Sequence, residues 1–231
     1  MLGNTLILIA SVLACVLPAG TIVAWAVSAL EWPGRRWVIR AGLVALFLPV
    51  LLQATSWDAA IGRQGWLGPW LGFAGVPALQ GWTAVILLHS VTALPWVAGL
   101  IGLGMRELEP ELLDQALLDG GPWSACWRTA VPRCRAWIAI AAAWTVVMVA
   151  SDMTITDMYQ VRTCAEVLYA DFALEDSPAA VVVGALPSIV TVASIVGLLL
   201  IVAWRWRPTV GRGPRRESRL VAWGGWTCGA T

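Results

Sequence analysis

The feature that most constrains this chain is an uninterrupted run of 29 uncharged residues at its start, from Leu2 to Leu30. The run reads "LGNTLILIASVLACVLPAGTIVAWAVSAL", and a helix needs about 20 mainly apolar residues to cross the hydrocarbon core of a bilayer. A cleaved signal peptide is the competing interpretation, but the run is too long for its apolar core and no basic residues precede it. We therefore predict a first membrane-spanning helix over about residues 4–30.

Four further apolar stretches follow the first. The chain has 231 residues, 59% of them hydrophobic and only 13% charged, which is typical of a membrane protein. The predicted fold is an all-α membrane protein with five transmembrane helices, the later four over about residues 38–57, 81–105, 136–156 and 179–204. Residues 66–80, rich in Gly, Pro and Trp, are predicted to form an interfacial or re-entrant segment. Residues 1–207 would form one transmembrane domain, and residues 208–231 a disordered tail.

The positions of the arginines predict the orientation of the helices. The turn after the first span, the segment 106–135 and the stretch after the last span together hold 13 of the 15 arginines; only Arg63 and Arg162 lie elsewhere. Positively charged loops face the cytoplasm, so these three regions are predicted to be cytoplasmic. The N-terminus would then lie outside and the C-terminus inside.

The composition excludes several kinds of chemistry. All fifteen basic residues are arginine, and without a lysine the chain cannot form a Walker-type nucleotide site or a Schiff base. His89 is the only histidine, and the five cysteines form no C-x-x-C pair, so neither a metal site nor a disulfide framework is expected. Ser90 beside His89 is not a catalytic dyad, because neighbours on a helix point about 100° apart. We therefore expect no enzymatic activity, and the formal charge of +1 favours no nucleic-acid partner.

The polar segment between the third and fourth spans has a helix–glycine–helix pattern. It reads "ELLDQALLDGGPWSACWRTAVP" from Glu111 to Pro132. Gly120 and Gly121 are predicted to end the first helix, and Pro122 suits the first turn of a second one. Four residues share one apolar side of the first helix, at the i, i+3 and i+4 spacing: Leu112, Leu113, Ala116 and Leu117. Amphipathicity alone would also suit a solvated helix that rests on lipid headgroups.

The order of residues in this segment resembles the EAA loop of binding-protein-dependent ABC importer permeases, with a transmembrane domain of the methionine-importer type. Six residues match that motif in order: Asp114 at its Glu, Gln115 and Ala116 at its two alanines, Asp119 and Gly120 at its Asp-Gly pair, and Pro132 at its closing proline. The resemblance covers about residues 4–206, including the opening "NTL" and the turn "WPGRR". Within the family it is nearest to the branch that imports ferric iron, thiamine and polyamines.

The resemblance implies a division of labour between subunits. Residues 106–135 would form a cytoplasmic coupling loop that docks on a separate ATP-binding subunit, so ATP and Mg would be bound there and this chain would hold no cofactor. A second permease chain would complete the solute pathway, because five spans cannot enclose one. A periplasmic or extracytoplasmic solute-binding protein would deliver the solute, and the expected location is the bacterial inner membrane.

Two polar residues inside the predicted spans are candidates for the solute pathway. Asp152 falls near the outer end of the fourth span and His89 near the middle of the third. The alternatives are contact with outer headgroups for Asp152 and a polar contact between helices for His89. Acidic residues also gather in the segment after Asp152, which would favour a cationic solute. A secondary transporter or channel without an ATPase partner remains the competing function, although the sequence shows no internal repeat.

Overall fold

The computed structural model describes residues 1–62, 65–67, 80–174, 178–206 and 221–222. Most of the predicted re-entrant segment, and the tail from residue 208 apart from residues 221–222, lie outside these ranges. Within them the secondary structure consists of helices joined by turns, with two short strands, β1 (Leu30–Glu31) and β2 (Val221–Ala222), which pair in parallel. The prediction of an all-α membrane protein is confirmed, because three helices are each long and apolar enough to cross a membrane.

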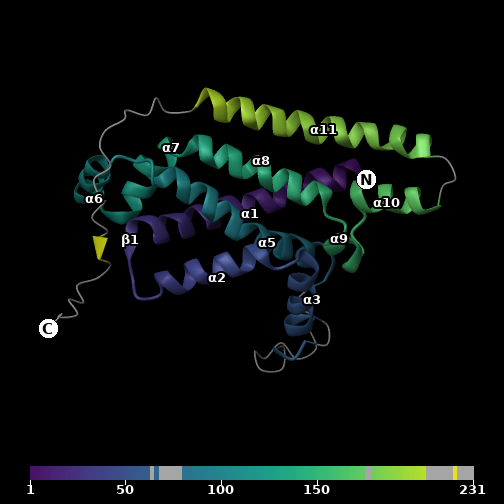
Figure 1. The fold of residues 1–231 in the computed structure, drawn as a ribbon, viewed down its shortest axis with the longest axis horizontal. Helices are drawn as coiled ribbons and strands as arrows, with labels where there is room; N and C mark the ends of the chain where they lie inside the picture. The colour runs from purple at the N-terminus through teal and green to yellow at the C-terminus, as the bar shows by residue number, and fades with distance from the viewer. Residues whose placement is uncertain (63–64, 68–79, 175–177, 207–220, 223–231) are drawn as a thin grey trace.

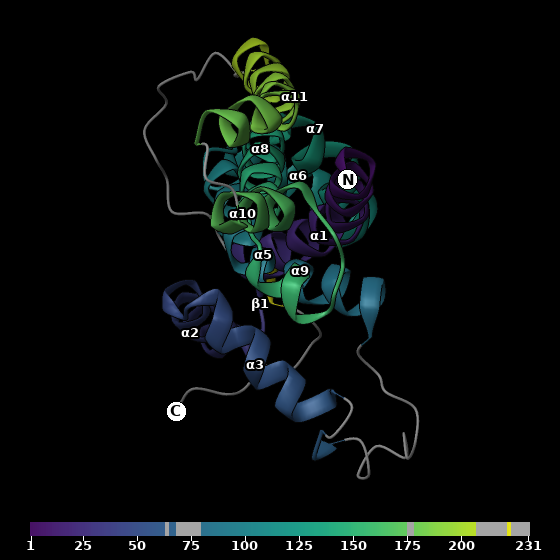
Figure 2. The same ribbon diagram turned by 90° about the vertical axis from the view of Figure 1, so that its right-hand side faces the viewer.

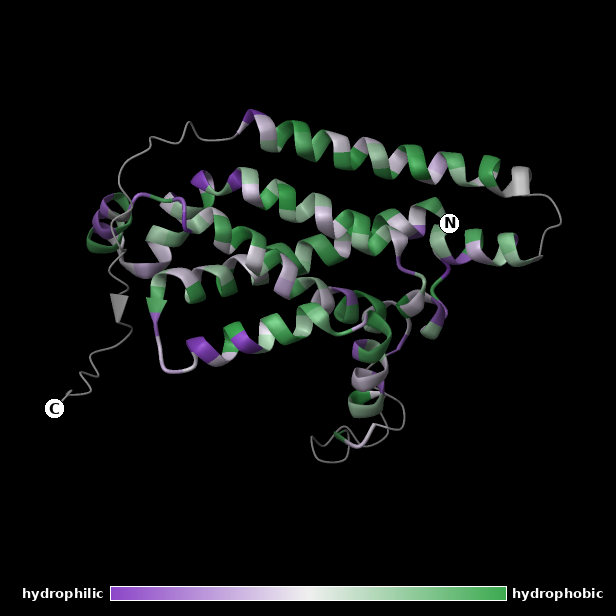
Figure 3. Ribbon diagram, in the orientation of Figure 1, coloured by the Kyte–Doolittle hydropathy of each residue, from purple (hydrophilic) through white to green (hydrophobic). Residues whose placement is uncertain are grey.

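Four long helices run alongside one another and form the body of the molecule (Figures 1 and 2). They are α1 (Leu2–Ala29), α5 (Gly81–Met105), α8 (Arg135–Ser151) and α11 (Pro178–Arg205). α1 and α8 both pack on α5, and α11 packs on α8. Apolar residues extend along these helices (Figure 3), as expected for segments that lie in hydrocarbon.

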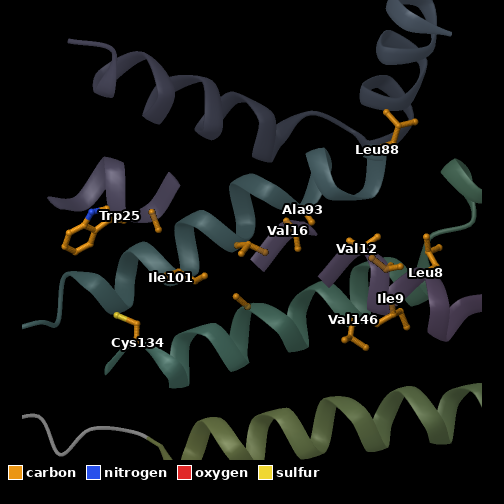
Figure 4. Close-up of a cluster of buried hydrophobic side chains, with 14 of the residues drawn as sticks. Leu8, Ile9, Val12, Val16, Trp25, Leu88, Ala93, Ile101, Cys134 and Val146 are labelled. Carbon is orange, nitrogen blue, oxygen red and sulfur yellow. The ribbon is translucent and has the colours of Figure 1, made fainter. Parts of the chain in front are cut away.

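The core lies mainly between α1 and α5. Leu8, Val12 and Val16 follow one another at four-residue spacing on α1 and are fully or almost fully buried. They form a single apolar cluster with Leu88 of α5 and Val146 of α8 (Figure 4). The two helices approach closely where α1 carries a glycine, because a Cβ at that position would lie 2.5 Å from a methyl carbon of Val97. Small residues permit such close helix contacts within membranes.

The predicted second span is not one straight helix. The structure has α2 (Arg35–Phe47) and α3 (Val50–Ile61), and the two axes are bent by 115°. Pro49 explains the break, since a proline restricts the preceding residue to extended conformations and Leu48 has φ −75° and ψ 126°. α2 has 13 residues and is about 20 Å long, so it cannot by itself cross a hydrocarbon core of about 30 Å.

The fourth predicted span also differs, because α8 ends at Ser151 and not near residue 156. Asp152 is extended, with φ −81° and ψ 126°, and its Oδ2 accepts a hydrogen bond of 3.0 Å from the backbone N–H of Ile155. Asp152 thereby caps the start of α9 (Thr154–Met158) in the manner of an N-cap residue. α10 (Cys164–Leu174) follows and leads towards α11.

The two ends of the helix bundle differ in content. One end, here called the α6 end, holds β1, α6 (Pro110–Ser124), η1 (Ala125–Ala130), α7 (Val131–Arg133) and the last turn of α11 (Figure 1). The other, the α9 end, holds the N-terminus, α3, α9 and α10. The arginines of the turn after α1 and of the segment between α5 and α8 therefore lie at one end of the molecule.

Candidate functional site

The segment between α5 and α8 is built from two short helices joined by a kink at Gly121. The second helix, here called the 122–133 helix, comprises the last turn of α6, the π-helical η1 and α7. Gly121 has φ 72° and ψ 178°, a region that only glycine occupies readily. The sequence analysis expected both glycines to act as a helix stop, but only Gly121 carries the unusual backbone.

Gly120 has a different role, which is close approach. A Cβ at this position would lie 2.5 Å from Oγ of Ser124 and 2.7 Å from its Cβ. Both separations are too short for real atoms, so any side chain at position 120 must force the two helices apart. The angle between α6 and the 122–133 helix therefore depends on two adjacent glycines, one through its backbone and one through its lack of a side chain.

The 122–133 helix is fastened to the bundle by small buried residues. Ala125, Cys126, Ala130 and Cys134 are at most 1% exposed and belong to the core. Burial raises the pKa of the Cys126 thiol to about 11; burial, with the nearby charges of Glu107 and Cys126, raises that of Cys134 to about 12. Both thiols therefore stay protonated and act as small apolar residues.

The 122–133 helix ends one residue beyond Pro132, the residue that matched the closing proline of the EAA pattern. Pro132 is exposed within α7, and the chain turns at Cys134, where φ is −84° and ψ is 6°. The segment Glu111–Arg133 meets α8 at an angle of 76°. Pro132 lies in the first turn of α7, a position where a proline is tolerated, so it does not itself end the helix.

A second anchor joins the start of this segment to α8. The indole N–H of Trp137 donates a hydrogen bond of 3.0 Å to Oε2 of Glu107, and the same ring packs directly over Gly104 at the end of α5. Leu113 and Leu117 of α6 pack against the core from the other side. A force applied to α6 would therefore reach both α5 and α8 through packed contacts.

We expect Gly104→Ala to loosen this anchor, because the new Cβ would overlap the Trp137 ring. Overpacking of this kind costs about 1–3 kcal/mol, so the thermal unfolding midpoint of the detergent-purified protein should fall. Gly99→Ala is the matched control, since it lies on the same helix and no atom stands within 4 Å of its added Cβ. Equal midpoints for the two variants would contradict the proposed anchor.

An open polar cavity of about 380 Å³ lies between α6 and the 122–133 helix. Its lining combines residues of both helices: Leu112, Gln115, Ala116, Asp119, Gly120, Ser124, Arg128, Thr129 and Arg133. Neither arginine has a hydrogen-bond or ion-pair partner among the residues that the structure describes, and the same holds for Asp119. The cavity therefore contains three charged groups without internal counter-ions.

The structure brings together four of the six residues that matched the EAA pattern. Gln115, Ala116, Asp119 and Gly120 line the cavity, whereas Asp114 is half-buried elsewhere on α6 and Pro132 lies beyond the lining. The sequence analysis used the arginines at 128 and 133 only to predict orientation. That these two arginines, with Ser124 and Thr129, line a cavity together with α6 was not predicted, because their position beside α6 depends on the kink angle.

The other two candidates, His89 and Asp152, form a buried pair. His89 Nε2 lies 3.3 Å from Asp152 Oδ2, and the side chains are 2% and 15% exposed. His89 Nδ1 lies 2.8 Å from the carbonyl oxygen of Val85, which only accepts, so Nδ1 carries a proton. Nε2 lies within ion-pair distance of Oδ2 but forms no hydrogen bond of good geometry with it. The polar contact between helices that the sequence analysis raised for His89 is thus present.

Further polar contacts surround this pair at the α9 end. The Tyr159 hydroxyl donates to Oδ1 of Asp58 at 3.0 Å and so links the residue after α9 to α3. Burial and the Asp58 carboxylate raise the pKa of Tyr159 above its usual range, which keeps this donor protonated. Oγ1 of Thr5 in α1 accepts a hydrogen bond of 3.0 Å from the backbone N–H of Cys164. These contacts tie α1, α3, α9 and α10 together at one end.

A mainly apolar cavity of about 670 Å³ also lies at this end, between α1, α8, α10 and α11. Neither His89 nor Asp152 lines it. Its polar groups are scattered hydroxyls such as those of Ser151, Ser188 and Thr191. The lining suits apolar contact more than recognition of a charged solute.

The chain is similar to permease proteins of several transport systems. No family model matches it. A probable sulfate transport system permease protein of Nephroselmis olivacea is 25% identical over 114 residues, which cover 49% of this chain and 40% of that protein. The diacetylchitobiose uptake system permease protein of Streptomyces coelicolor is 27% identical over 140 residues, 60% of this chain and 42% of that protein.

A trehalose transport system permease protein of Mycobacterium tuberculosis is 29% identical over 159 residues, which are 64% of this chain and 52% of that protein. The matches thus span about half the length of these relatives or less. The homologues are ABC importer permeases, which supports the family that the EAA-like segment indicated. Their names refer to sulfate and sugars, so they do not support the ferric iron, thiamine and polyamine branch.

Proposed function

We propose that this chain, whose homologues are permeases of ABC importers, is the permease subunit of an ATP-driven importer and forms half of a solute pathway. The observation that carries the proposal is the kinked helix pair between α5 and α8, with four EAA-like residues gathered around one cavity. The pair is anchored in the core at Cys126 and Cys134, and Glu107, just before α6, is hydrogen-bonded to Trp137 of α8. A rigid element of this kind can carry a displacement from a surface partner to the membrane helices.

In this proposal α6 is the coupling helix and the partner is a separate ATP-binding subunit. A short helix with an anchored apolar side and charged residues on its exposed side is a suitable contact for a groove in another protein. ATP and Mg would be bound by that partner, which agrees with the lack of lysine in this chain. A second permease chain, identical or related, would complete the pathway, and an extracytoplasmic binding protein would deliver the solute at the α9 end.

The proposal includes a location and an orientation. The protein would be a multi-pass protein of the bacterial inner membrane, with the α6 end in the cytoplasm. The arginine content of that end supports this orientation, since positively charged segments remain on the cytoplasmic side. The N-terminus at the α9 end would then lie outside.

His89 and Asp152 are proposed to border the solute pathway as one buried pair. Their burial supports a fixed pair more than a freely moving gate. Acidic side chains at this end, including Asp58 and Asp157, would favour a cationic solute such as ferric iron, thiamine or a polyamine. The names of the relatives favour an anion or a sugar instead, so competition of both solute classes for uptake distinguishes the two.

The decisive experiment is reconstitution of the purified membrane complex into liposomes. We expect an ATP-binding subunit to co-purify and solute uptake to require ATP. A secondary transporter or channel would move solute with an ion gradient alone and without that subunit, which is the outcome that would overturn the proposal. The subunit stoichiometry, measured by mass spectrometry, would also give the number of permease chains per complex.

A further inference from the structure

We propose that the polar cavity between α6 and the 122–133 helix receives an acidic side chain of the ATP-binding subunit, held by Arg128 and Arg133. The inference rests on the proposed function and deepens it, because it names the chemistry of the contact. Its basis is the pair of guanidinium groups that line one cavity of about 380 Å³ without an internal counter-ion among the described residues.

The charges of the lining define the ligand. Two arginines and Asp119 leave one net positive charge, which a single carboxylate neutralises. A guanidinium binds a carboxylate through two parallel N–H···O bonds, a geometry that lysine cannot reproduce. Ser124 and Thr129 add hydroxyl donors to the same lining. The cavity is thus equipped to bind an anionic oxygen group.

The lining favours a protein over a lipid as the source of the anionic oxygen group. Gln115 and Asp119, on the α6 side of the lining, need a donor as well as an acceptor from whatever fills the cavity. A protein surface can place a carboxylate beside the arginines and a separate hydrogen-bond donor beside Asp119, whereas a phosphate group alone offers Asp119 no donor. The cavity also opens beside the helix proposed to enter the partner, so a partner that grips α6 would reach these arginines.

The lack of lysine makes the test unusually specific. Arg128→Lys or Arg133→Lys would introduce the only lysine of the chain, and the only other amine is the N-terminus at the α9 end. A carbodiimide joins an amine to a carboxylate with no spacer, forming an amide bond with loss of water. Applied to the purified complex, it should link each variant to an Asp or Glu of the ATP-binding subunit, identified by mass spectrometry of the joined peptides.

Arg106→Lys is the matched control, because Arg106 is exposed in the same segment but does not line the cavity. We expect little or no product from it. The combined variant Arg128→Ala with Arg133→Ala should lower the apparent affinity for the ATP-binding subunit by roughly tenfold, and more steeply as salt is lowered. Arg106→Ala should change that affinity by less than about twofold.

Each remaining outcome contradicts the inference in a recognisable way. If the lysines join only Asp119 of the same chain while the ATP-binding subunit stays bound, the cavity contact is wrong and the proposed function is unaffected. If the double alanine variant instead loses affinity for vesicles of anionic phosphatidylglycerol relative to phosphatidylcholine, the occupant is a lipid phosphate. If no ATP-binding subunit accompanies the unaltered protein, both the inference and the proposed function fail.

Discussion

Gly120→Arg is expected to leave membrane insertion intact while solute uptake falls and ATP hydrolysis continues. Position 120 is exposed on α6, so a long side chain does not disturb the buried helices. Any Cβ there would nevertheless meet Ser124 at 2.5 Å and change the angle between the two short helices. Coupling between sites is typically about 1–3 kcal/mol, so its loss corresponds to a decrease of about 5- to 150-fold in uptake per ATP hydrolysed.

A compensating pair of substitutions tests whether the loss of uptake has a steric cause. Gly120→Ala should impair uptake less than Gly120→Arg, and adding Ser124→Gly should restore it, because both atoms that the new Cβ would meet are removed. The measurements are uptake and ATP hydrolysis in the same proteoliposomes. Normal uptake by the Gly120→Arg variant would refute the coupling role of α6.

Gly121 allows a further distinction, since its requirement is conformational and not steric. No atom lies within 4 Å of a Cβ at this position, but φ is +72°. Gly121→Ala would therefore cost about 1–3 kcal/mol of backbone strain, which substitution of Ser124 cannot relieve. The two neighbouring glycines should thus respond differently to the same second substitution.

Removing one partner of the His89–Asp152 pair is expected to give the largest loss of stability. Asp152→Ala removes the carboxylate that faces the buried Nε2 of His89, and it also removes the cap of α9. Loss of one member of a buried pair costs about 3 kcal/mol or more, and loss of a cap adds about 1 kcal/mol. The expected measurement is a lower thermal unfolding midpoint for Asp152→Ala than for the unaltered protein.

Asp152→Asn is the informative comparison. Both contacts of Asp152 use Oδ2, and an asparagine oxygen in that place can still accept the Ile155 N–H and face Nε2 of His89. Stability should therefore fall less than in Asp152→Ala. If Asp152→Asn is stable and transports normally, the pair is structural and the proposed place beside the solute pathway is wrong. If the variant is stable but fails to transport a cationic solute, the carboxylate charge itself is required.

The long helices follow closely from the sequence. The predicted spans 4–30, 81–105 and 179–204 correspond to α1, α5 and α11, whose ends differ by at most two residues. Prolines inside these helices, such as Pro18 and Pro95, do not break them. The two spans that differ, 38–57 and 136–156, end where a local signal was present: Pro49 after Leu48, and the capping carboxylate of Asp152.

The candidate site was predictable only in part. The helix–glycine–helix pattern and the EAA-like residues are visible in the order of the chain, but that order does not say which glycine adopts a positive φ. It also does not show that Asp114 lies away from the cavity while Arg128 and Arg133 line it. These facts depend on the angle at Gly121, since a change of that angle would move the 122–133 helix away from α6.

The sequence by itself determined which segments are helices in hydrocarbon, because transfer into a membrane depends on the local number of apolar and charged residues. It also grouped the arginines of the turn after α1 and of the segment between α5 and α8, which lie at one end in the structure. The tertiary structure alone decided the pairing of His89 with Asp152 and the cavity shared by Asp119, Arg128 and Arg133. Such contacts join residues from different helices, and they exist only at the distances and angles that close packing permits.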